Sequence, residues 1–269
     1  MPNPSHDAGL LAGKTGLVLN IANDRSIAWH IAQRCVSAGA DVGFGFLSAN
    51  EKMERRARKA IDDIDGIGDD YFLHGCDVGS DESIAEFFDA AGKRFGKIDF
   101  LVHSLAFADR TYLAKGKFLE TPREVFAQAC DISAYSLIGL TRAAAPLMTD
   151  GGSVIALTYL GSEKAVPGYN VMGVAKAALE SSARYLAFEL GEKNIRVNSL
   201  SAGPVRTLSA MAVGGIDEMF EHTQRKAPLK RNIDGDEVGK TALYLLSDLS
   251  SGVTGECHYV DAGFRQVGL

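Results

Sequence analysis

Residues 15–28 read TGLVLNIANDRSIA and contain a strand, a tight turn and the start of a helix. The apolar run from Thr15 to Leu19 predicts a buried strand, and apolar residues recur at helical spacing between residues 26 and 38. A turn that enters a helix offers unpaired N–H groups and a positive dipole end, which suits a pyrophosphate. Asn20 stands where such a turn usually has a glycine, but asparagine tolerates left-handed backbone angles. The alternative reading is an ordinary capped helix.

The alternation of strand and helix continues along the chain. Further strands are expected near residues 41–46, 71–75, 98–103, 153–158, 195–200 and 257–260, and helices near 50–64, 80–95, 121–148, 169–190 and 236–247. Gly39 should end the first helix, and the helix from Thr121 should start with that hydroxyl as its cap, Pro122 first and Glu124 completing a capping box. Strict alternation predicts an α/β fold, a Rossmann-type doubly wound parallel sheet with helices on both faces.

Composition narrows the function classes. The chain has 269 residues, of which 46% are hydrophobic, so we expect one large domain over residues 11–269 behind a flexible tail of residues 1–10. No signal peptide or membrane span is visible, which favours a cytoplasmic protein. A net charge of −6 without a long basic block argues against a nucleic-acid partner. The four widely separated cysteines lack metal-ligand spacing and predict reduced thiols and no metal site.

Ligands of such a sheet bind beyond the carboxyl ends of its strands. After the second strand, Phe46-Leu47-Ser48 offers no acid for an adenosine ribose and no adjacent arginine for a 2′-phosphate, so the choice between NADH and NADPH stays open at this point. Asp77 follows the third strand and could accept a hydrogen bond from an adenine amino group. An ordinary exposed loop aspartate is the alternative.

A tyrosine and a lysine suggest the chemistry. Tyr169 and Lys176 are seven positions apart in an expected helix, which would place both side chains on one face. A lysine cation there can hold ribose hydroxyls, while the tyrosine stabilises an oxyanion as a hydride arrives at carbon. Taken alone, a tyrosine and a lysine at this spacing are more often surface residues.

Together with their neighbours, these residues make the chain resemble the divergent branch of the short-chain dehydrogenase/reductase superfamily. Within that branch it is similar to the enoyl-acyl-carrier-protein reductases of bacterial type II fatty-acid synthesis, from about Leu11 to Phe264. The resemblance rests on residues 22–28 (ANDRSIA), 76–78 (CDV), 103–108 (HSLAFA), 159–161 (YLG), 169–173 (YNVMG) with Lys176, 196–198 (RVN) and 201–207 (SAGPVRT).

The resemblance implies reduction of a trans-2-enoyl thioester borne by acyl carrier protein, in a homotetramer. It implies that Tyr169 hydrogen-bonds the thioester carbonyl, that Lys176 binds the nicotinamide ribose, and that Tyr159 lies beside the substrate. NADH is the expected cofactor, because no arginine follows Phe46 directly; NADPH is the alternative, with Lys52 and Arg55 nearby. Candidate cofactor contacts are Asn20, Ala22, Ser26, Ile27, Leu47, Asp77, Val78, Ser104, Leu105, Ala106, Lys176, Val205 and Thr207. Candidate substrate contacts are Ala108, Tyr159, Tyr169, Met172, Val213 and Met219.

Two alternatives stay open. The carbonyl-reducing branch of the superfamily places lysine four residues after the tyrosine and serine about 13 before it, where this chain has Gly173 and Ala156. A non-catalytic nucleotide-binding paralogue is the second alternative, and Asn20 in the phosphate turn is the feature that favours it.

Three further features concern the edge of the expected site. Ala262 departs from the usual Val-Asp-Gly-Gly of the relatives near the last strand. Asp217 and Glu218 stand where relatives often carry basic residues for carrier docking; Arg225, Lys226, Lys230 and Arg231 could substitute, or could form a solvated face. The apolar stretch 208–220, with glycines at 214 and 215, is expected to be a mobile cover over the acyl chain, a permanently packed helix being the alternative.

Overall fold

A parallel sheet forms the centre of the protein. The structure, a computed structural model, describes residues 9–207, 210–212 and 216–268. Its seven-stranded sheet has the order β3-β2-β1-β4-β5-β6-β7. The strands are β1 (Thr15–Leu19), β2 (Asp41–Phe46), β3 (Leu73–Gly75), β4 (Phe100–His103), β5 (Gly152–Thr158), β6 (Ile195–Ala202) and β7 (Cys257–Val260), and all neighbours pair in parallel. The predicted fold class is thereby confirmed.

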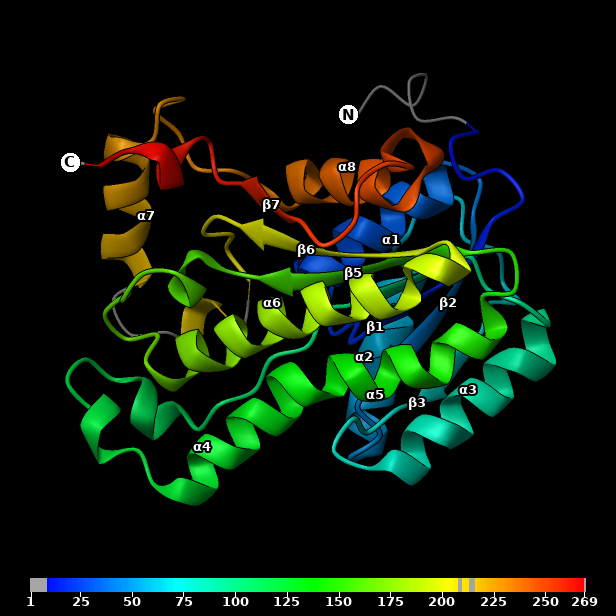
Figure 1. Ribbon diagram of the computed structural model, residues 1–269, viewed down its shortest axis with the longest axis horizontal. Coiled ribbons are helices and arrows are strands. Elements are labelled where there is room, and N and C mark those ends of the chain that lie inside the picture. Colours follow the sequence, from blue (N-terminus) through cyan, green and yellow to red (C-terminus); the bar gives the residue numbers. More distant parts are fainter. Residues whose placement is uncertain (1–8, 208–209, 213–215, 269) are drawn as a thin grey trace.

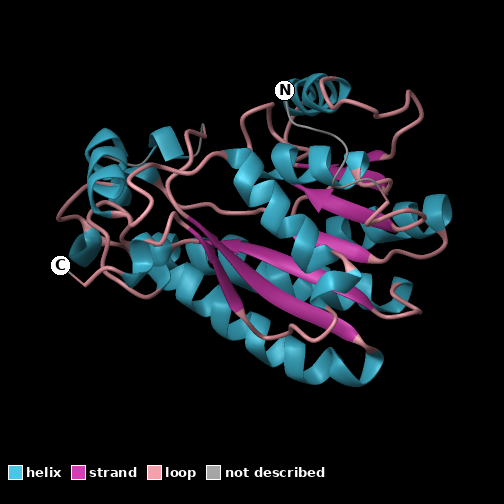
Figure 2. Ribbon diagram, turned by 90° about the horizontal axis from the view of Figure 1, so that it is seen from above, coloured by secondary structure: helices cyan, strands magenta, loops and turns pink. Residues whose placement is uncertain are grey.

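Helices cover both faces of this sheet (Figures 1 and 2). One face carries α1 (Ile27–Ser37), α2 (Glu51–Asp62) and α8 (Gly235–Leu246), and the other carries α3 (Asp81–Phe95), α5 (Ser136–Ala144) and α6 (Val171–Leu190). Because successive strand residues point to opposite faces, Val18 packs into the first core while its neighbours Leu17 and Leu19 pack into the second. In Figure 1 the arrowheads of β5, β6 and β7 point towards α7 (Ile216–Lys226), which lies at the ligand edge.

The expected helix over 121–148 is interrupted. It consists of α4 (Arg123–Cys130), a π-helical turn (Asp131–Tyr135), α5, and a final 3₁₀ turn (Ala145–Leu147). The predicted capping box is wrong: Pro122 takes the N-cap position without a side-chain hydrogen bond, and the Thr121 hydroxyl donates to the Phe118 carbonyl at 2.7 Å. A nearby carbonyl in the preceding 3₁₀ turn therefore competes successfully for the hydroxyl.

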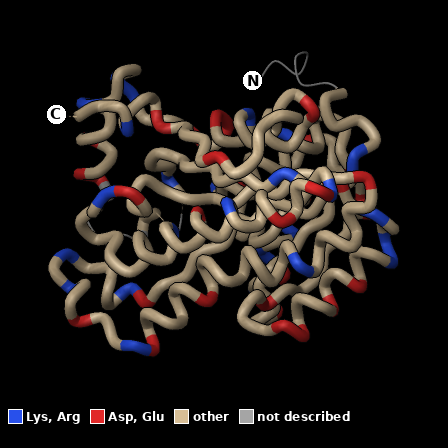
Figure 3. The backbone as a smooth tube through the Cα atoms, in the orientation of Figure 1, with Lys and Arg blue, Asp and Glu red and all other residues tan. Residues whose placement is uncertain are grey.

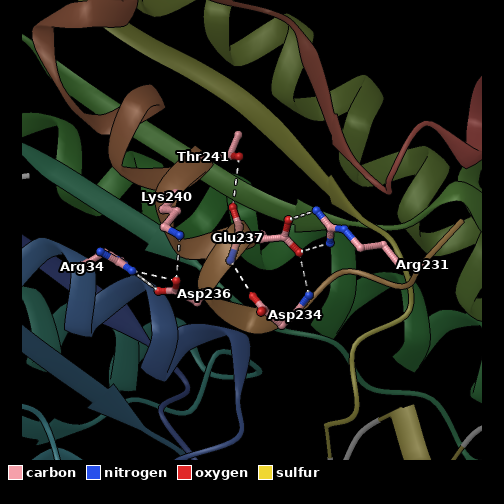
Figure 4. Close-up of polar contacts among 7 residues, drawn as sticks. All are labelled: Arg34, Arg231, Asp234, Asp236, Glu237, Lys240 and Thr241. Carbon is pink, nitrogen blue, oxygen red and sulfur yellow. Dashed lines mark hydrogen bonds and ion pairs between the residues drawn. The ribbon is translucent and has the colours of Figure 1, made fainter. Parts of the chain in front are cut away.

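Charged side chains tie α8 to α1 across the first face (Figure 4). The Arg34 guanidinium, which is buried, donates to both carboxylate oxygens of Asp236 at 2.6 and 2.7 Å, and Lys240 approaches the same carboxylate at 3.0 Å. Asp234 and Glu237 form the capping box that starts α8. The backbone of α8 can approach α1 closely because residue 239 is a glycine. A Cβ at this position would lie only 2.7 Å from the His30 carbonyl oxygen.

Charges of both signs are interspersed along the described chain (Figure 3). This distribution agrees with the absence of a long basic block from the sequence. Among the described helices, none is long and apolar enough to cross a membrane. The four cysteines, Cys35, Cys76, Cys130 and Cys257, are all free thiols.

Candidate active site

Asn20 forms the turn that leaves β1. Its φ angle is +67°, the left-handed conformation for which a glycine would be expected. The Asn20 carboxamide donates to the Ser104 carbonyl at 2.9 Å, and its backbone N–H donates to the Gly45 carbonyl at 2.8 Å. Asparagine therefore makes the turn that glycine would make and also joins it to the loop after β4.

Ser26 caps α1 at the predicted phosphate end. Its hydroxyl accepts from the Trp29 N–H at 3.2 Å and donates to the Asn23 carbonyl at 2.7 Å. The hydroxyl proton is thus used inside the turn, and the Trp29 N–H is used by the cap, which leaves the backbone N–H groups of Ile27 and Ala28 as the donors for a phosphate. Ala22 and Ile27 flank this helix start.

The predicted adenosine contacts lie at the ends of β2 and β3. Leu47 is 44% exposed directly after β2, and Asp77 is exposed after β3, where its carboxylate accepts from the Gly79 N–H at 3.0 Å. Val78 is buried beneath this loop. Their positions beside the phosphate turn suit an adenosine, and the roles assigned to them stay predictions.

Lys176 reaches the same edge from α6. The lysine is 4% exposed, and its ammonium donates to the carbonyls of Leu105 at 2.9 Å and Leu157 at 2.7 Å, so it bridges the ends of β4 and β5. Burial lowers the pKa of Lys176 to about 8, against a smaller raising effect of Glu180 one turn along the helix. At pH 7 the side chain is therefore still charged and has a third N–H to offer.

Tyr169 lies before the helix rather than on it. Because α6 begins at Val171, with Asn170 at a φ of +46°, the argument from helical spacing is wrong, although both side chains belong to the same ligand edge. The ring centroids of Tyr169 and Tyr159 are 5.0 Å apart in an edge-to-face arrangement. Desolvation, with Tyr159 and Glu180 nearby, raises the pKa of Tyr169 above its ordinary range. Among the described residues, no side chain or backbone group hydrogen-bonds the Tyr169 hydroxyl.

Two glycines make room for this tyrosine pair. A Cβ at Gly161 would lie 2.3 Å from Cδ1 of Tyr169, and a Cβ at Gly173 would lie 2.6 Å from the Gly161 carbonyl oxygen. The loop after β5 can therefore rest directly on the start of α6. This packing explains why glycine occurs in both the 159–161 and the 169–173 motifs.

Apolar side chains surround the tyrosines on the predicted substrate side. Ala108 and Met172 belong to a small buried cluster with Leu113, Ala129 and Val171, against which Tyr169 packs. Met219 of α7 accepts a hydrogen bond on its sulfur from the Tyr159 hydroxyl at 3.1 Å. Burial raises the pKa of Tyr159 to about 12. Val213 and the other predicted cover residues at 208–209 and 214–215 lie outside the described residues.

The remaining predicted cofactor residues line two loops. Ser104, Leu105 and Ala106 follow β4, and the first two give their carbonyls to Asn20 and Lys176. Val205 is buried after β6, while the Thr207 hydroxyl accepts from the Ala210 N–H at 3.0 Å. These loops follow β4 and β6, the two strands that flank β5 in the sheet.

Sequence reasoning assigned no role to three buried polar residues near the site: His103, Ser133 and Glu180. Glu180 accepts from the Thr158 hydroxyl at 2.6 Å and lies one turn beyond Lys176. A glutamate four residues after a lysine in an apolar helix was a usable signal. His103 and Ser133 gave no comparable signal, because their partners are 33 and 26 residues away in the sequence.

Fold and site together define a short-chain dehydrogenase/reductase, with a tyrosine and a buried lysine at the carboxyl edge of a doubly wound sheet. A model of the family described as "Enoyl-(Acyl carrier protein) reductase" matches residues 21–265. The chain belongs to this enoyl-(acyl carrier protein) reductase family.

Individual relatives cover almost the whole chain. It is 51% identical to "Enoyl-[acyl-carrier-protein] reductase [NADH] FabI" of Nostoc sp. over 96% of this chain and 99% of that protein. The enoyl-acyl-carrier-protein reductase of Anaplasma phagocytophilum in complex with NAD is 42% identical, with a TM-score of 0.91 over 97% of both chains. The Bacillus cereus reductase with NADP+ and indole naphthyridinone is 46% identical, with a TM-score of 0.93 over 97% of this chain and 99% of that one.

Proposed function

We propose that this protein reduces the trans-2 double bond of an enoyl thioester borne by acyl carrier protein, with NADH as reductant, in fatty-acid biosynthesis. The observation that carries the proposal is that Lys176 and the tyrosine pair meet the same strand end: the buried ammonium binds the Leu157 carbonyl, two residues before Tyr159, and the Tyr159 ring packs against Tyr169. Membership of the family and the NADH-dependent relatives support the substrate class and the cofactor.

The donor groups at the sheet edge fit a dinucleotide. Lys176 has one N–H beyond the two that bind carbonyls, which suits a ribose hydroxyl, and the start of α1 offers backbone N–H groups to the pyrophosphate. Asp77 and Leu47 would flank the adenosine, with Ser104, Ala106, Val205 and Thr207 towards the nicotinamide. Bound NADH supplies the hydride that adds to the β-carbon of the substrate.

Tyr169 would stabilise the charge that this addition creates. Its raised pKa keeps the hydroxyl protonated at neutral pH, so that it can donate a hydrogen bond to the thioester carbonyl. Negative charge collects on that oxygen as the enolate forms, and a donor already in place stabilises it without reorganisation. The Lys176 ammonium adds a positive potential, and a proton then reaches the α-carbon.

Carbonyl reduction is less well supported. The position 13 residues before Tyr169 is Ala156, which is fully buried within β5 and has no hydroxyl to offer. The position four residues after Tyr169 is Gly173, whose missing Cβ is needed for packing on Gly161.

The test compares crotonyl and acetoacetyl thioesters as substrates, each with NADH and NADPH. We expect NADH oxidation with the crotonyl thioester alone. Tyr169→Phe should lower kcat by about 10²-fold or more, the usual loss when an oxyanion donor is removed. Lys176→Ala should in addition weaken NADH binding. Wild-type turnover in both variants at saturating NADH would contradict the assigned roles.

Carrier docking is proposed at Arg225 and Lys226 in the last turn of α7. Asp217 and Glu218, the two acidic residues in the first turn of this helix, already have partners, since Glu218 pairs with Lys115 at 2.8 Å and Asp217 with Arg206 at 3.4 Å. Arg231 is held by Glu237, which leaves the end of α7 as the basic surface beside the site. Charge reversal of Arg225 and Lys226 should raise KM for a carrier-bound thioester and leave that for a coenzyme A thioester unchanged; equal effects on both would contradict docking.

A homotetramer is proposed from apolar side chains on the outer surface of α4 and α6. Tyr185 and Phe188 of α6 are 71% and 85% exposed, and Phe126 of α4 and Val174 of α6 are also exposed. We infer that these exposed apolar side chains belong to an interaction surface. Light scattering should give a tetramer mass, which Tyr185→Glu with Phe188→Glu should reduce; a monomeric wild type would refute this assembly.

A further inference from the structure

The loop over residues 104–108 joins the parts of the proposed site. It has no regular secondary structure, yet its backbone carbonyls serve different elements: Ser104 accepts from Asn20 of the phosphate turn, and Leu105 accepts from Lys176. The position of this loop therefore sets the position of the Lys176 ammonium. The contacts that fix the backbone of this loop therefore determine how accurately the Lys176 ammonium is placed.

Ser133 holds the loop from behind. The residue is fully buried, and its hydroxyl accepts from the Phe107 N–H at 2.9 Å and donates to the Phe107 carbonyl at 3.1 Å. One side chain thus satisfies both backbone polar groups of a residue that has no strand partner. Without this hydroxyl, both groups would lose their partner together.

Ser133 lies in the π-helical turn between α4 and α5. Turns of this kind occur within α-helices mostly as single turns and frequently at functional sites. Ser136, the first residue of α5, donates its hydroxyl hydrogen to the Ile132 carbonyl of this turn at 2.7 Å, and its oxygen lies 2.8 Å from Nε2 of His103, from which it accepts in the tautomer protonated at Nε2. His103 immediately precedes the loop, so the loop is attached at one end to the π-helical turn through Ser133 and at the other end to the first residue of α5 through Ser136.

His103 is buried in the neutral form. Burial, with the nearby Lys176 charge, lowers its pKa to about 3, and its Nδ1 has no hydrogen-bond partner within the described chain. The neutral ring adds no competing charge beside the lysine. The attachment of the loop to the π-helical turn and to the start of α5 is therefore made by hydrogen bonds of uncharged groups.

We propose that Ser133 is a positioning residue for the reaction: it fixes the 104–108 loop through Phe107 and thereby places the Leu105 carbonyl that orients Lys176. This inference rests on the proposed function of Lys176. It assigns Ser133 no contact with substrate or cofactor.

The test compares Ser133→Ala with Ser153→Ala. Ser153 is equally buried and its hydroxyl donates to the Leu245 carbonyl at 2.8 Å, but it lies at the opposite end of β5, away from the ligand edge. Both variants lose one buried hydroxyl and should lose similar thermal stability. Only Ser133→Ala should lower kcat, by about tenfold, with KM for the crotonyl thioester within about twofold, because a misplacement well under 1 Å suffices for such a loss.

Amide hydrogen exchange at Phe107 gives a direct measure of the loop. Exchange should be accelerated in Ser133→Ala and unchanged in Ser153→Ala. If the alanine variant does not fold, Ser133→Cys keeps the side-chain volume with a much weaker hydrogen-bonding group and should change kcat and exchange in the same direction. Wild-type kcat in a variant with fast Phe107 exchange, or equal kcat losses in both alanine variants, would overturn the inference. A wild-type protein that binds NADH without reducing the enoyl thioester would instead refute the proposed function.

Discussion

Gly161→Ala tests whether the loop after β5 sets the position of Tyr169. The added Cβ would lie 2.3 and 2.8 Å from Cδ1 and Cε1 of the Tyr169 ring, whereas carbon atoms in contact prefer about 3.5 to 4.0 Å. The ring would have to retreat by about 1 Å, and the Tyr159 ring beside it leaves little space for that movement. Overpacking of this kind costs about 1–3 kcal/mol of unfolding free energy.

The larger effect should be on turnover. A displacement of about 1 Å at a reacting group can cost about 10²-fold, so kcat for the crotonyl thioester should fall by one to two orders of magnitude while NADH binding changes little. Gly191→Ala is the control, because nothing lies within 4 Å of its Cβ at the other end of α6. A Gly161→Ala protein with wild-type kcat would show that Tyr169 is not held by this contact.

Four further expectations concern binding, stability and specificity. NADH affinity should fall as pH rises through about 8, because Lys176 loses its charge there, and an unchanged affinity up to pH 9.5 would contradict that role. Asp236→Asn should lower the unfolding free energy by about 1–2 kcal/mol, the carboxylate being one-third exposed and partly screened. Arg34 lowers the pKa of Asp236 in the folded protein, so the stabilisation by this ion pair is fully present above the unfolded pKa of about 3.9. The stabilisation is lost as the pH falls through the folded pKa, which urea titrations at pH 7 and pH 3 can measure. Steady-state kinetics should give a higher kcat/KM with NADH than with NADPH, and the reverse order would show that Lys52 or Arg55 reaches a 2′-phosphate. Amide exchange of α7 should slow when NADH and an unreactive acyl analogue bind, because Met219 joins the helix to Tyr159; identical exchange with and without ligands would identify α7 as a fixed part of the core.

The sequence predicts the sheet well because its strands are buried and apolar. β1, β2 and β7 begin and end at the predicted residues, while β3 is shorter than expected because only Leu73–Gly75 pairs with β2. The helix caps were harder to predict, as the Thr121 hydroxyl shows by its bond to Phe118. Whether a hydroxyl caps a helix depends on which of several nearby backbone groups it hydrogen-bonds. The free-energy differences between these alternatives are small.

The candidate site could be predicted only as a set of residue types. The sequence singles out Tyr169 and Lys176, and their catalytic roles stay predictions. The helical spacing that connected them is wrong, since Tyr169 precedes α6. Residues from other segments of the chain position the two side chains: Gly161 packs against the Tyr169 ring, and the carbonyls of Leu105 and Leu157 accept from Lys176. Contacts between distant segments leave no periodic pattern, and for this reason the contacts of Ser133 and His103 could not be predicted.

The π-helical turn also sets the rotational register of the long helix that contains it. Each residue advances an α-helix by about 100°, so the extra residue in Asp131–Tyr135 turns every side chain after it by that amount relative to the side chains before it. Phe126 of α4 can then face outward while Leu137 and Leu140 of α5 are fully buried. Removal of one residue from this turn would leave the composition of the helix almost unchanged but would rotate one half against the other. The π-helical turn therefore sets which side chains of α4 face outward while the side chains of α5 stay in the core.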